Sequence, residues 1–299
     1  MFLVSSGFGS AAASCTQTGT PGDDTIYGTS GNDVICGLGG NDTIFGGAGN
    51  DELRSGPGDD TLSGGLGDDT MHGGTGADTA TYASSTSPVI VNLTTDDAIR
   101  EGTDRDSLPG IENVTGTAQG DHLLGDSAAN ILRGGGGDDT MQGLAGDDTL
   151  AGGAGTDTVL YYAGFTPAIN VNLATDTATG YGTDSLPGVE NAFGSGRGDT
   201  LIGDGQANVL GGKRGNDAVF GRGGADQLYG QIDDDEVHGG NGDDHLSGGD
   251  GADYLHGDAD DDSLFGNAGP DHLDGGTGFD RCVSRDGLDV IDPSCEVTS

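Results

Sequence analysis

The sequence predicts an all-β fold, a solenoid built from nine-residue units that each form half a turn. The unit is clearest at residues 239–247, where glycines hold positions one, two and four, an aspartate holds position six and leucine holds position eight. Such a unit contains a turn followed by a three-residue strand. Composition supports this reading, because glycine supplies 63 of the 299 residues, far above the roughly 7% of an average protein.

Each position of the unit has a physical role. Glycines at positions one, two and four let the backbone adopt positive φ, which residues with side chains resist, so a tight turn with exposed carbonyl groups results. The aspartate at position six adds an anionic oxygen beside those carbonyls, which is the ligand set that calcium prefers. Positions seven to nine form a minimal strand whose middle side chain points inward. The unit therefore predicts a metal-binding loop followed by a strand.

Three runs keep this register without a gap, at residues 19–81, 116–160 and 194–283. Position six is acidic in 20 of their 22 units, which predicts that these aspartates are metal ligands. The predicted ligands are Asp24, Asp33, Asp42, Asp51, Asp60, Asp69, Asp78, Asp121, Asp139, Asp148, Asp157, Asp199, Asp217, Asp226, Asp235, Asp244, Asp253, Asp262, Asp271 and Asp280. Asn130 and Asn208 hold position six in the two remaining units.

Position eight predicts the core. It is Ile, Leu, Val or Met in 20 of the 22 units, and the exceptions are Ala80 and Cys282. Because a nine-residue unit is half a turn, units 18 residues apart are expected to stack, so that odd and even units lie on opposite edges. A bound ion is then expected to be shared between units n and n+2.

Two inserts interrupt the runs, at residues 82–106 and 161–184, and their sequences resemble each other. Each contains an alternating apolar strand and a polar loop, and each is followed by a degenerate unit with Glu112 or Glu190 at position six. We expect each insert to form a wider turn of the solenoid, and a binding loop grafted on the solenoid is the alternative.

The charge of the chain limits its partners. Fifty acidic residues against ten Lys and Arg give a formal net charge of −40, which argues against nucleic acid as a partner. High charge with low hydrophobicity is also typical of disorder. Disorder does not require an aspartate every ninth residue, so the repeat favours a folded chain, provided that cations are present.

The ends of the chain differ from the repeats. Residues 1–18 begin with an apolar stretch and contain small residues, so we interpret them as a secretory-signal remnant and N-terminal tail, without the usual basic segment. Residues 19–283 are expected to form one elongated solenoid, and residues 284–299 a C-terminal cap. No apolar stretch approaches the roughly 18 residues of a membrane span.

From residue 19 to residue 283 the chain resembles the RTX-type, or haemolysin-type, calcium-binding repeats of bacterial secreted proteins, on the G-G-x-G-x-D-x-U-x unit described above. This resemblance implies a right-handed parallel β-roll in which several Ca²⁺ ions lie between loops of successive turns, bound by the twenty aspartates and by loop carbonyls. The departures at Asn130, Asn208, Glu112 and Glu190 leave the ions of those turns in question. The resemblance also implies secretion, but it identifies a scaffold rather than an activity.

Four cysteines lie in two pairs near the ends of the repeats, Cys15 with Cys36 and Cys282 with Cys295. A solenoid of about eleven turns at roughly 4.8 Å spacing separates the two ends by about 50 Å, whereas a disulfide spans less than about 7 Å between Cα atoms. Only the local pairing is therefore possible. Disulfides suit an exported protein and would prevent the ends of the solenoid from fraying.

Catalytic signatures are absent from the sequence: it contains no H-E-x-x-H, G-x-S-x-G or G-x-x-x-x-G-K-[ST] motif. The histidines lie at positions seven or nine, which flank the inward side chain, so we expect them on the surface; a zinc cluster is the alternative. They are His72, His122, His238, His245, His256 and His272. Thr25, Thr43, Thr61 and Thr79 hold position seven of alternate units and could stack as an outward ladder of the kind that binds ice.

These observations predict a secreted, non-enzymatic calcium-binding protein whose β-roll folds when Ca²⁺ binds. Two alternatives remain open. A polysaccharide-active solenoid enzyme would show convergent carboxylates with a basic residue on one face, and a surface or ice adhesin would show a flat, regular threonine array. The sequence does not identify a protein or polysaccharide partner.

Overall fold

A computed structural model describes residues 14–100, 104–161, 167–285 and 288–298. Most of the predicted signal segment, residues 1–18, lies outside these ranges. The described residues form an all-β structure whose one helical segment within these ranges is the 3-10 turn η1 (Leu173–Thr175). No helix in the described ranges is long and apolar enough to cross a membrane. The chain divides into two compact units, one comprising residues 1–80 and 103–111 and the other residues 81–102 and 112–299.

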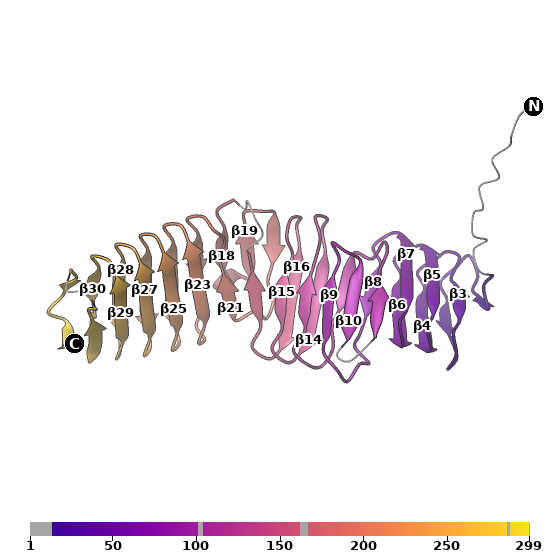
Figure 1. The fold of residues 1–299 in the computed structure, drawn as a ribbon, viewed down its shortest axis with the longest axis horizontal. Helices are drawn as coiled ribbons and strands as arrows, with labels where there is room; N and C mark the ends of the chain where they lie inside the picture. The colour runs from indigo at the N-terminus through magenta and orange to yellow at the C-terminus, as the bar shows by residue number, and fades with distance from the viewer. Residues whose placement is uncertain (1–13, 101–103, 162–166, 286–287, 299) are drawn as a thin grey trace, which may run out of the picture. The chain divides into compact units, whose positions relative to one another are not determined.

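The first unit is a parallel β-solenoid in which strands from alternate repeats pair with one another (Figure 1). Thr25 is the register partner of Thr43, and Thr43 of Thr61, so stacked residues are 18 apart. This confirms that nine residues make half a turn. One sheet holds β2 (Thr25–Tyr27), β4 (Thr43–Ala48), β6 (Thr61–Leu66) and β8 (Thr79–Thr81); the other holds β1 (Gln17–Thr18), β3 (Val34–Cys36), β5 (Glu52–Pro57), β7 (Thr70–Thr75) and β11 (Arg105–Ser107).

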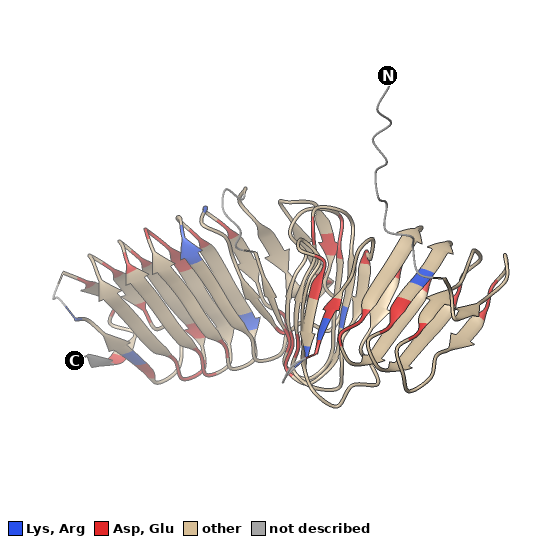
Figure 2. Ribbon diagram, turned by 45° about the vertical axis from the view of Figure 1, so that its right-hand side comes forward, with Lys and Arg blue, Asp and Glu red and all other residues tan. Residues whose placement is uncertain are grey.

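The second unit has the same architecture, with two series of strands. One series is β9 (Val89–Asn92), β10 (Asp97–Arg100), β13 (His122–Leu124), β15 (Thr140–Gln142), β17 (Thr158–Leu160), β21 (Asn191–Phe193), β23 (Val209–Arg214), β25 (Gln227–Ile232), β27 (His245–Asp250), β29 (Ser263–Ala268), β31 (Asp280–Val283) and β33 (Cys295–Thr298). The other is β12 (Asn113–Thr115), β14 (Ile131–Gly136), β16 (Thr149–Ala154), β18 (Asn170–Asn172), β19 (Thr177–Thr179), β20 (Thr183–Ser185), β22 (Thr200–Ile202), β24 (Ala218–Gly223), β26 (Glu236–Asn241), β28 (Tyr254–Ala259), β30 (His272–Asp274) and β32 (Val290–Ile291). Figure 2 shows acidic residues concentrated where these strands turn.

The core of each unit is the stack of position-eight side chains. Leu228, Leu246, Leu264 and Cys282 follow one another in register, and all four are fully buried. Ala80, the other exception to the aliphatic pattern, is also fully buried. The apolar core is narrow, because each half-turn of the repeats contributes one buried position-eight side chain. Stability therefore depends strongly on contacts within the loops.

Each insert contributes a hairpin as well as strands of the solenoid. In the first, β9 pairs parallel with β13 and antiparallel with β10. In the second, β18 pairs parallel with β22, while β19 runs antiparallel to both β18 and β20. The nonapeptide pattern did not predict these antiparallel strands. The division into a single solenoid over residues 19–283 and a cap over 284–299 stays a prediction.

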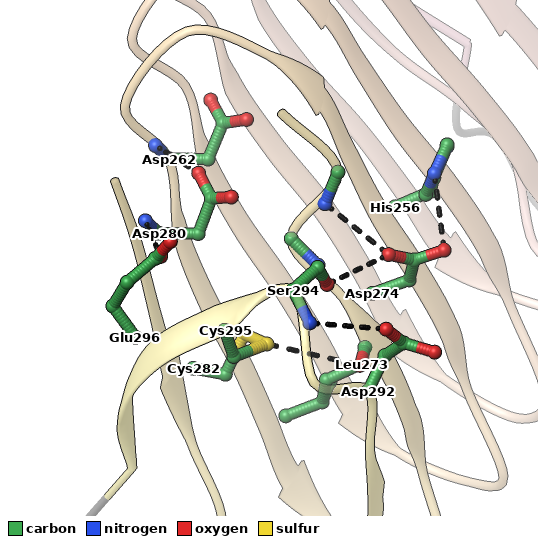
Figure 3. Close-up of a disulfide and its surroundings, with 12 residues drawn as sticks. His256, Asp262, Leu273, Asp274, Asp280, Cys282, Asp292, Ser294, Cys295 and Glu296 are labelled. Atoms are coloured by element: carbon green, nitrogen blue, oxygen red, sulfur yellow. Dashed lines mark hydrogen bonds and ion pairs between the residues drawn. A yellow bond between two sulfur atoms is a disulfide. The ribbon is translucent and has the colours of Figure 1, made fainter. Parts of the chain in front are cut away.

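Both predicted disulfides are present. Cys15 bonds to Cys36 with 5.9 Å between their Cα atoms, and Cys282 bonds to Cys295 with 5.7 Å (Figure 3). Cys36 and Cys282 hold ladder positions in β3 and β31, so each bond joins a residue beside or beyond the repeats to a strand of the solenoid. The local pairing predicted from the sequence is therefore confirmed.

Candidate metal centre

The position-six carboxylates form continuous ladders along the stacked loops. Oδ1 of Asp262 accepts the backbone N–H of Asp244 at 2.8 Å, and Oδ1 of Asp280 accepts the N–H of Asp262 at 3.0 Å (Figure 3). The same contact recurs between residues 18 apart in both units, for example from Asp33 to Asp51 at 2.8 Å. One carboxylate oxygen of each such aspartate is therefore occupied by the backbone of the neighbouring turn.

Sixteen of the 22 loops share one backbone conformation, in which the residues at positions two and four both have positive φ. We call them open loops. Position four is glycine in 14 of them, as at Gly242 with φ of 117°. The exceptions are Asp233 and Asp260, and aspartate is one of the few other residues that tolerate this region.

In thirteen of the open loops the second carboxylate oxygen lacks a donor. Oδ2 is buried and accepts no hydrogen bond in thirteen of the position-six aspartates: Asp42, Asp51, Asp60, Asp139, Asp148, Asp157, Asp217, Asp226, Asp235, Asp244, Asp253, Asp262 and Asp280. Asp69, Asp78 and Asp271 hold the same position in three further open loops. A buried carboxylate oxygen without a partner costs free energy unless a cation or proton neutralises it.

A second oxygen converges on the same place. At Gly46, position one of its loop, an added Cβ would lie 2.5 Å from Oδ2 of Asp51 and 2.5 Å from the carbonyl oxygen of Gly64. Glycine is required there because these two oxygens approach the α-carbon so closely. A carboxylate and a carbonyl oxygen are hard ligands, so this donor set suits Ca²⁺ and does not suit a thiophilic or imidazole-binding metal.

Burial raises the pKa of many of these aspartates. Desolvation raises the pKa of Asp217 and of Asp262 to about 8, against the hydrogen bond from the neighbouring backbone N–H, and adjacent aspartates raise it further. The pKa of Asp244 rises to about 7 and that of Asp148 to about 6, with desolvation again the main cause. Stacked carboxylates that resist ionisation are sites where a cation would be most favourable.

The six other loops are closed by their own side chains, and we call them self-capped loops. Position two is Thr, Ser or Asp, and its backbone N–H donates to the position-six side chain, as from Thr117 to Oδ2 of Asp121 at 2.6 Å. The Thr117 hydroxyl also accepts the N–H of Gln119 at 2.9 Å, which completes a local turn. The self-capped loops span residues 19–24, 28–33, 116–121, 125–130, 194–199 and 203–208.

These six loops are the first two of each run. Four predicted ligands, Asp24, Asp33, Asp121 and Asp199, lie in them, and the carboxylate of each accepts a hydrogen bond from position two of its own loop. The structure thus brings sixteen of the twenty predicted residues into open loops and places four where the loop itself satisfies the carboxylate.

The two asparagines at position six have a structural explanation. Oδ1 of Asn130 accepts the N–H of Asp126 at 2.8 Å, and its amide group donates to the carbonyl oxygen of Glu112 at 2.8 Å. Asn208 makes the same contact with the carbonyl oxygen of Glu190 at 2.7 Å. The degenerate unit presents a carbonyl where other units present an N–H, so a side chain that can donate is needed.

Three further aspartates hold position-six sites that the repeat pattern did not identify. Asp106 accepts the N–H of Asp69 at 3.0 Å, Asp184 that of Asp148 at 3.1 Å, and Asp289 that of Asp271 at 3.1 Å. Each begins the D-x-U part of the unit, as in Asp-Ser-Leu at residues 106–108, but lacks the glycine at position one. That shorter signal was available in the sequence.

Position five also contributes to stacking. The exposed Asp243 accepts the N–H of Asp261 at 3.2 Å, and Asn41 similarly accepts the N–H of Asp59 at 3.0 Å. Side chains at this position therefore link neighbouring turns, in addition to being solvated.

The features behind the two alternative functions can be located in the structure. The predicted threonine ladder exists, since Thr25, Thr43, Thr61 and Thr79 are consecutive register partners. It is one residue wide, because the neighbouring outward position holds Tyr27, Phe45 and Ser63.

A cavity of about 440 Å³ in the second unit is lined by Leu93, Thr94, Asp126, Ser127, Gln142, Leu144, Ala145, Leu160, Tyr161 and Tyr181. Among the described residues, its lining holds one carboxylate and no Lys or Arg.

A parallel β-solenoid with stacked, oxygen-lined acidic loops defines a calcium-binding repeat protein. Comparison with protein families agrees. The RTX calcium-binding nonapeptide repeat matches residues 18–53, 45–80, 109–141, 124–159, 193–228, 211–246, 229–264, 247–282 and 256–291. These stretches cover well over half of the chain, which therefore belongs to the RTX calcium-binding nonapeptide repeat family. No curated protein matches the chain.

Proposed function

We propose that this chain is a secreted, non-enzymatic scaffold whose solenoid folds when Ca²⁺ binds between the open loops of successive turns. The observation that carries the proposal is the row of buried Oδ2 atoms that accept no hydrogen bond. In several of these loops, as at Gly46, Gly239 and Gly257, a carbonyl oxygen of the next turn converges on position one beside Oδ2. A hard cation bound there would satisfy both kinds of oxygen at once.

The charge of the chain explains why folding would depend on the ion. Formal net charge is −40, and the ladders place position-six carboxylates in direct succession. Bringing these charges together without cations is unfavourable, and the narrow core offers little apolar burial to offset it. A ligand that binds only the folded chain stabilises it by mass action, so the binding free energy of Ca²⁺ becomes folding free energy.

Secretion is proposed because folding of the chain would depend on Ca²⁺. Calcium is abundant outside the cell and scarce in the cytosol, so such a chain would remain unfolded until export. The two disulfides support an oxidising destination. In this proposal the open loops of each run bind the ions, and the self-capped loops start each run without metal.

A circular dichroism titration tests the proposal on the full chain. In excess chelator the chain is expected to lack strand signal, and it should gain that signal cooperatively at roughly 10⁻⁴ to 10⁻³ M Ca²⁺, the range of extracellular modules. Mg²⁺ at the same concentrations is the control, because its strict octahedral geometry and tightly held water fit these loops poorly. A fully folded spectrum in chelator would contradict the proposal.

A further inference from the structure

A cluster of histidines and carboxylates lies on the outward face of one sheet in the second unit. His238 in β26 and His256 in β28 hold position nine of alternate repeats and are direct register partners. Asp258 joins them, and one potential ligand atom from each of the three residues lies within 4.8 Å of the others. The cluster is separate from the open-loop carboxylates, which are buried at position six.

The two imidazole rings are oriented alike. Nδ1 of His238 lies 3.6 Å from Oδ2 of Asp258, and Nδ1 of His256 lies 2.7 Å from Oδ1 of the same carboxylate. On the opposite side of each ring, Nε2 of His238 lies 3.0 Å from Glu236 and Nε2 of His256 lies 3.2 Å from Asp274. Both rings therefore direct Nδ1 toward a shared carboxylate and Nε2 toward an outer one.

The outer carboxylate of Asp274 is itself held in place. Its Oδ1 accepts hydrogen bonds from the Ser294 hydroxyl at 2.9 Å and from the N–H of Gly276 at 3.2 Å, which leaves Oδ2 for His256 (Figure 3). On the other side of the cluster, the ring of Phe220 stacks on His238 at 5.2 Å between centroids. Neighbouring side chains thus restrict both rings before any ligand arrives.

We propose that His238, His256 and Asp258 form a site for a divalent transition metal such as Zn²⁺, with Glu236 and Asp274 as its outer partners. Two imidazoles and a carboxylate are a common zinc ligand set, whereas Ca²⁺ takes oxygen ligands. Metal-bound histidines almost always donate their other ring N–H to a carboxylate, carbonyl or water, and Glu236 and Asp274 lie where that requires. A metal ion here would replace the direct contacts between Asp258 and the two Nδ1 atoms.

The site also has an accessible side. The histidine side chains are 24% and 25% exposed and that of Asp258 is 36% exposed, so solvent or a ligand can supply the fourth position of a tetrahedral zinc ion. Asp258 is at position two of an open loop, with φ of 77°, where Gly240 stands in the preceding turn. The carboxylate at this position is what distinguishes the cluster from an ordinary pair of stacked histidines.

Isothermal titration of Zn²⁺ into the full, calcium-saturated chain tests the proposal, with Co²⁺ absorption reporting the coordination. We expect one equivalent bound, an affinity at least about tenfold weaker in His256→Ala and in Asp258→Asn, and a loss of about 10- to 100-fold in Asp274→Asn, as for other outer-shell partners. His245→Ala is the matched control, because His245 lies in β27 of the other series of strands. Its affinity should equal that of the original chain.

Three results would overturn the site: no binding in the original chain, equal binding after His256→Ala, or binding abolished by excess Ca²⁺. The last two would mean that Zn²⁺ occupies the open-loop carboxylates. Circular dichroism of each variant in Ca²⁺ shows whether it is folded. Because the titration is performed on calcium-saturated protein, its failure would leave the proposed calcium-dependent folding unaffected.

Discussion

Asp33 and Asp51 are neighbours in one ladder, and the contrast between them shows what determines the chemistry of a loop. Asp33 lies in a self-capped loop, where Thr29 donates both its hydroxyl and its N–H and thereby lowers the pKa of the carboxyl group. Asp51 lies in an open loop, where desolvation raises the pKa and Oδ2 accepts no hydrogen bond. Both hold position six of a glycine-containing unit, so the difference originates at position two. Thr29 provides donors at that position, whereas Gly47 in the loop of Asp51 leaves the carboxylate for a cation.

The largest effect is expected when Asp51 is neutralised, and Asp33 provides the matched control. Asp51→Asn should raise the calcium concentration at the folding midpoint about tenfold, equivalent to about 1.4 kcal/mol, because an ionic ligand is lost while the Oδ1 acceptor remains. Asp33→Asn should leave the midpoint nearly unchanged, since Asn130 shows that an amide oxygen accepts the same capping N–H. Equal shifts in the two variants would show that total charge, rather than loop class, governs folding.

Acid should partly replace calcium. Asp217 and Asp262 have pKa values of about 8 in the metal-free fold, and those of Asp235 and Asp253 are about 7, against about 3.9 in an unfolded chain. The folded state then binds more protons, so its metal-free stability increases as pH falls from about 8 toward about 4, and is lost as pH rises through the folded pKa values. Strand signal in chelator should therefore be greater at pH 5 than at pH 8. A decrease over that interval would refute this account of the open loops.

Mutations in two loops should be energetically coupled only when the loops stack on the same edge of the solenoid. The N–H of Asp244 donates to Asp262, which lies 18 residues later in the same ladder. Asp253 belongs to the ladder on the opposite edge, where it accepts the N–H of Asp235. A double-mutant cycle of Asp244→Ala with Asp262→Ala should give a coupling of about 0.5 to 3 kcal/mol in calcium-dependent stability. The cycle with Asp253→Ala should be nearly additive. Stronger coupling to Asp253 would indicate that adjacent units share an ion.

A smaller effect is expected inside a self-capped loop. Thr29→Val removes the hydroxyl that bonds Asp33 and accepts the N–H of Gly31, while keeping a β-branched side chain. Urea unfolding in saturating Ca²⁺ should show a loss of about 1 kcal/mol, with no change in the calcium midpoint. A shifted midpoint would place an ion in this loop.

Much of this organisation follows from sequence. Glycine, aspartate and the aliphatic residue at fixed offsets predicted the solenoid, its 18-residue stacking and the buried position eight. The positions of the four cysteines predicted both disulfides. The hairpins β9–β10 and β18–β19 could not be predicted in this way, because each is a local antiparallel turn inside an insert, where the sequence does not follow the nine-residue period. The histidine cluster needed the structure too, since the sequence placed His238 and His256 on the surface without revealing the orientation of their rings.

The six self-capped loops share Thr, Ser or Asp at position two, but this pattern was not used to separate the two loop classes. Thr, Ser or Asp replaces the position-two residue of all six self-capped loops, and the carboxylates of Asp24, Asp33, Asp121 and Asp199 were treated like the other sixteen. A side chain at position two that reaches the backbone is a known turn former. What sequence alone lacks is the φ at positions two and four, which decides where the loop carbonyls point.

An anomalous difference map from crystals of the calcium-saturated protein would test the central claim most directly. The account predicts peaks beside the Oδ2 atoms of the open loops, including those of Asp51 and Asp244, and none in the six self-capped loops. Peaks at Asp33 or Asp121, or open loops without peaks, would contradict the assignment of calcium binding to loop class.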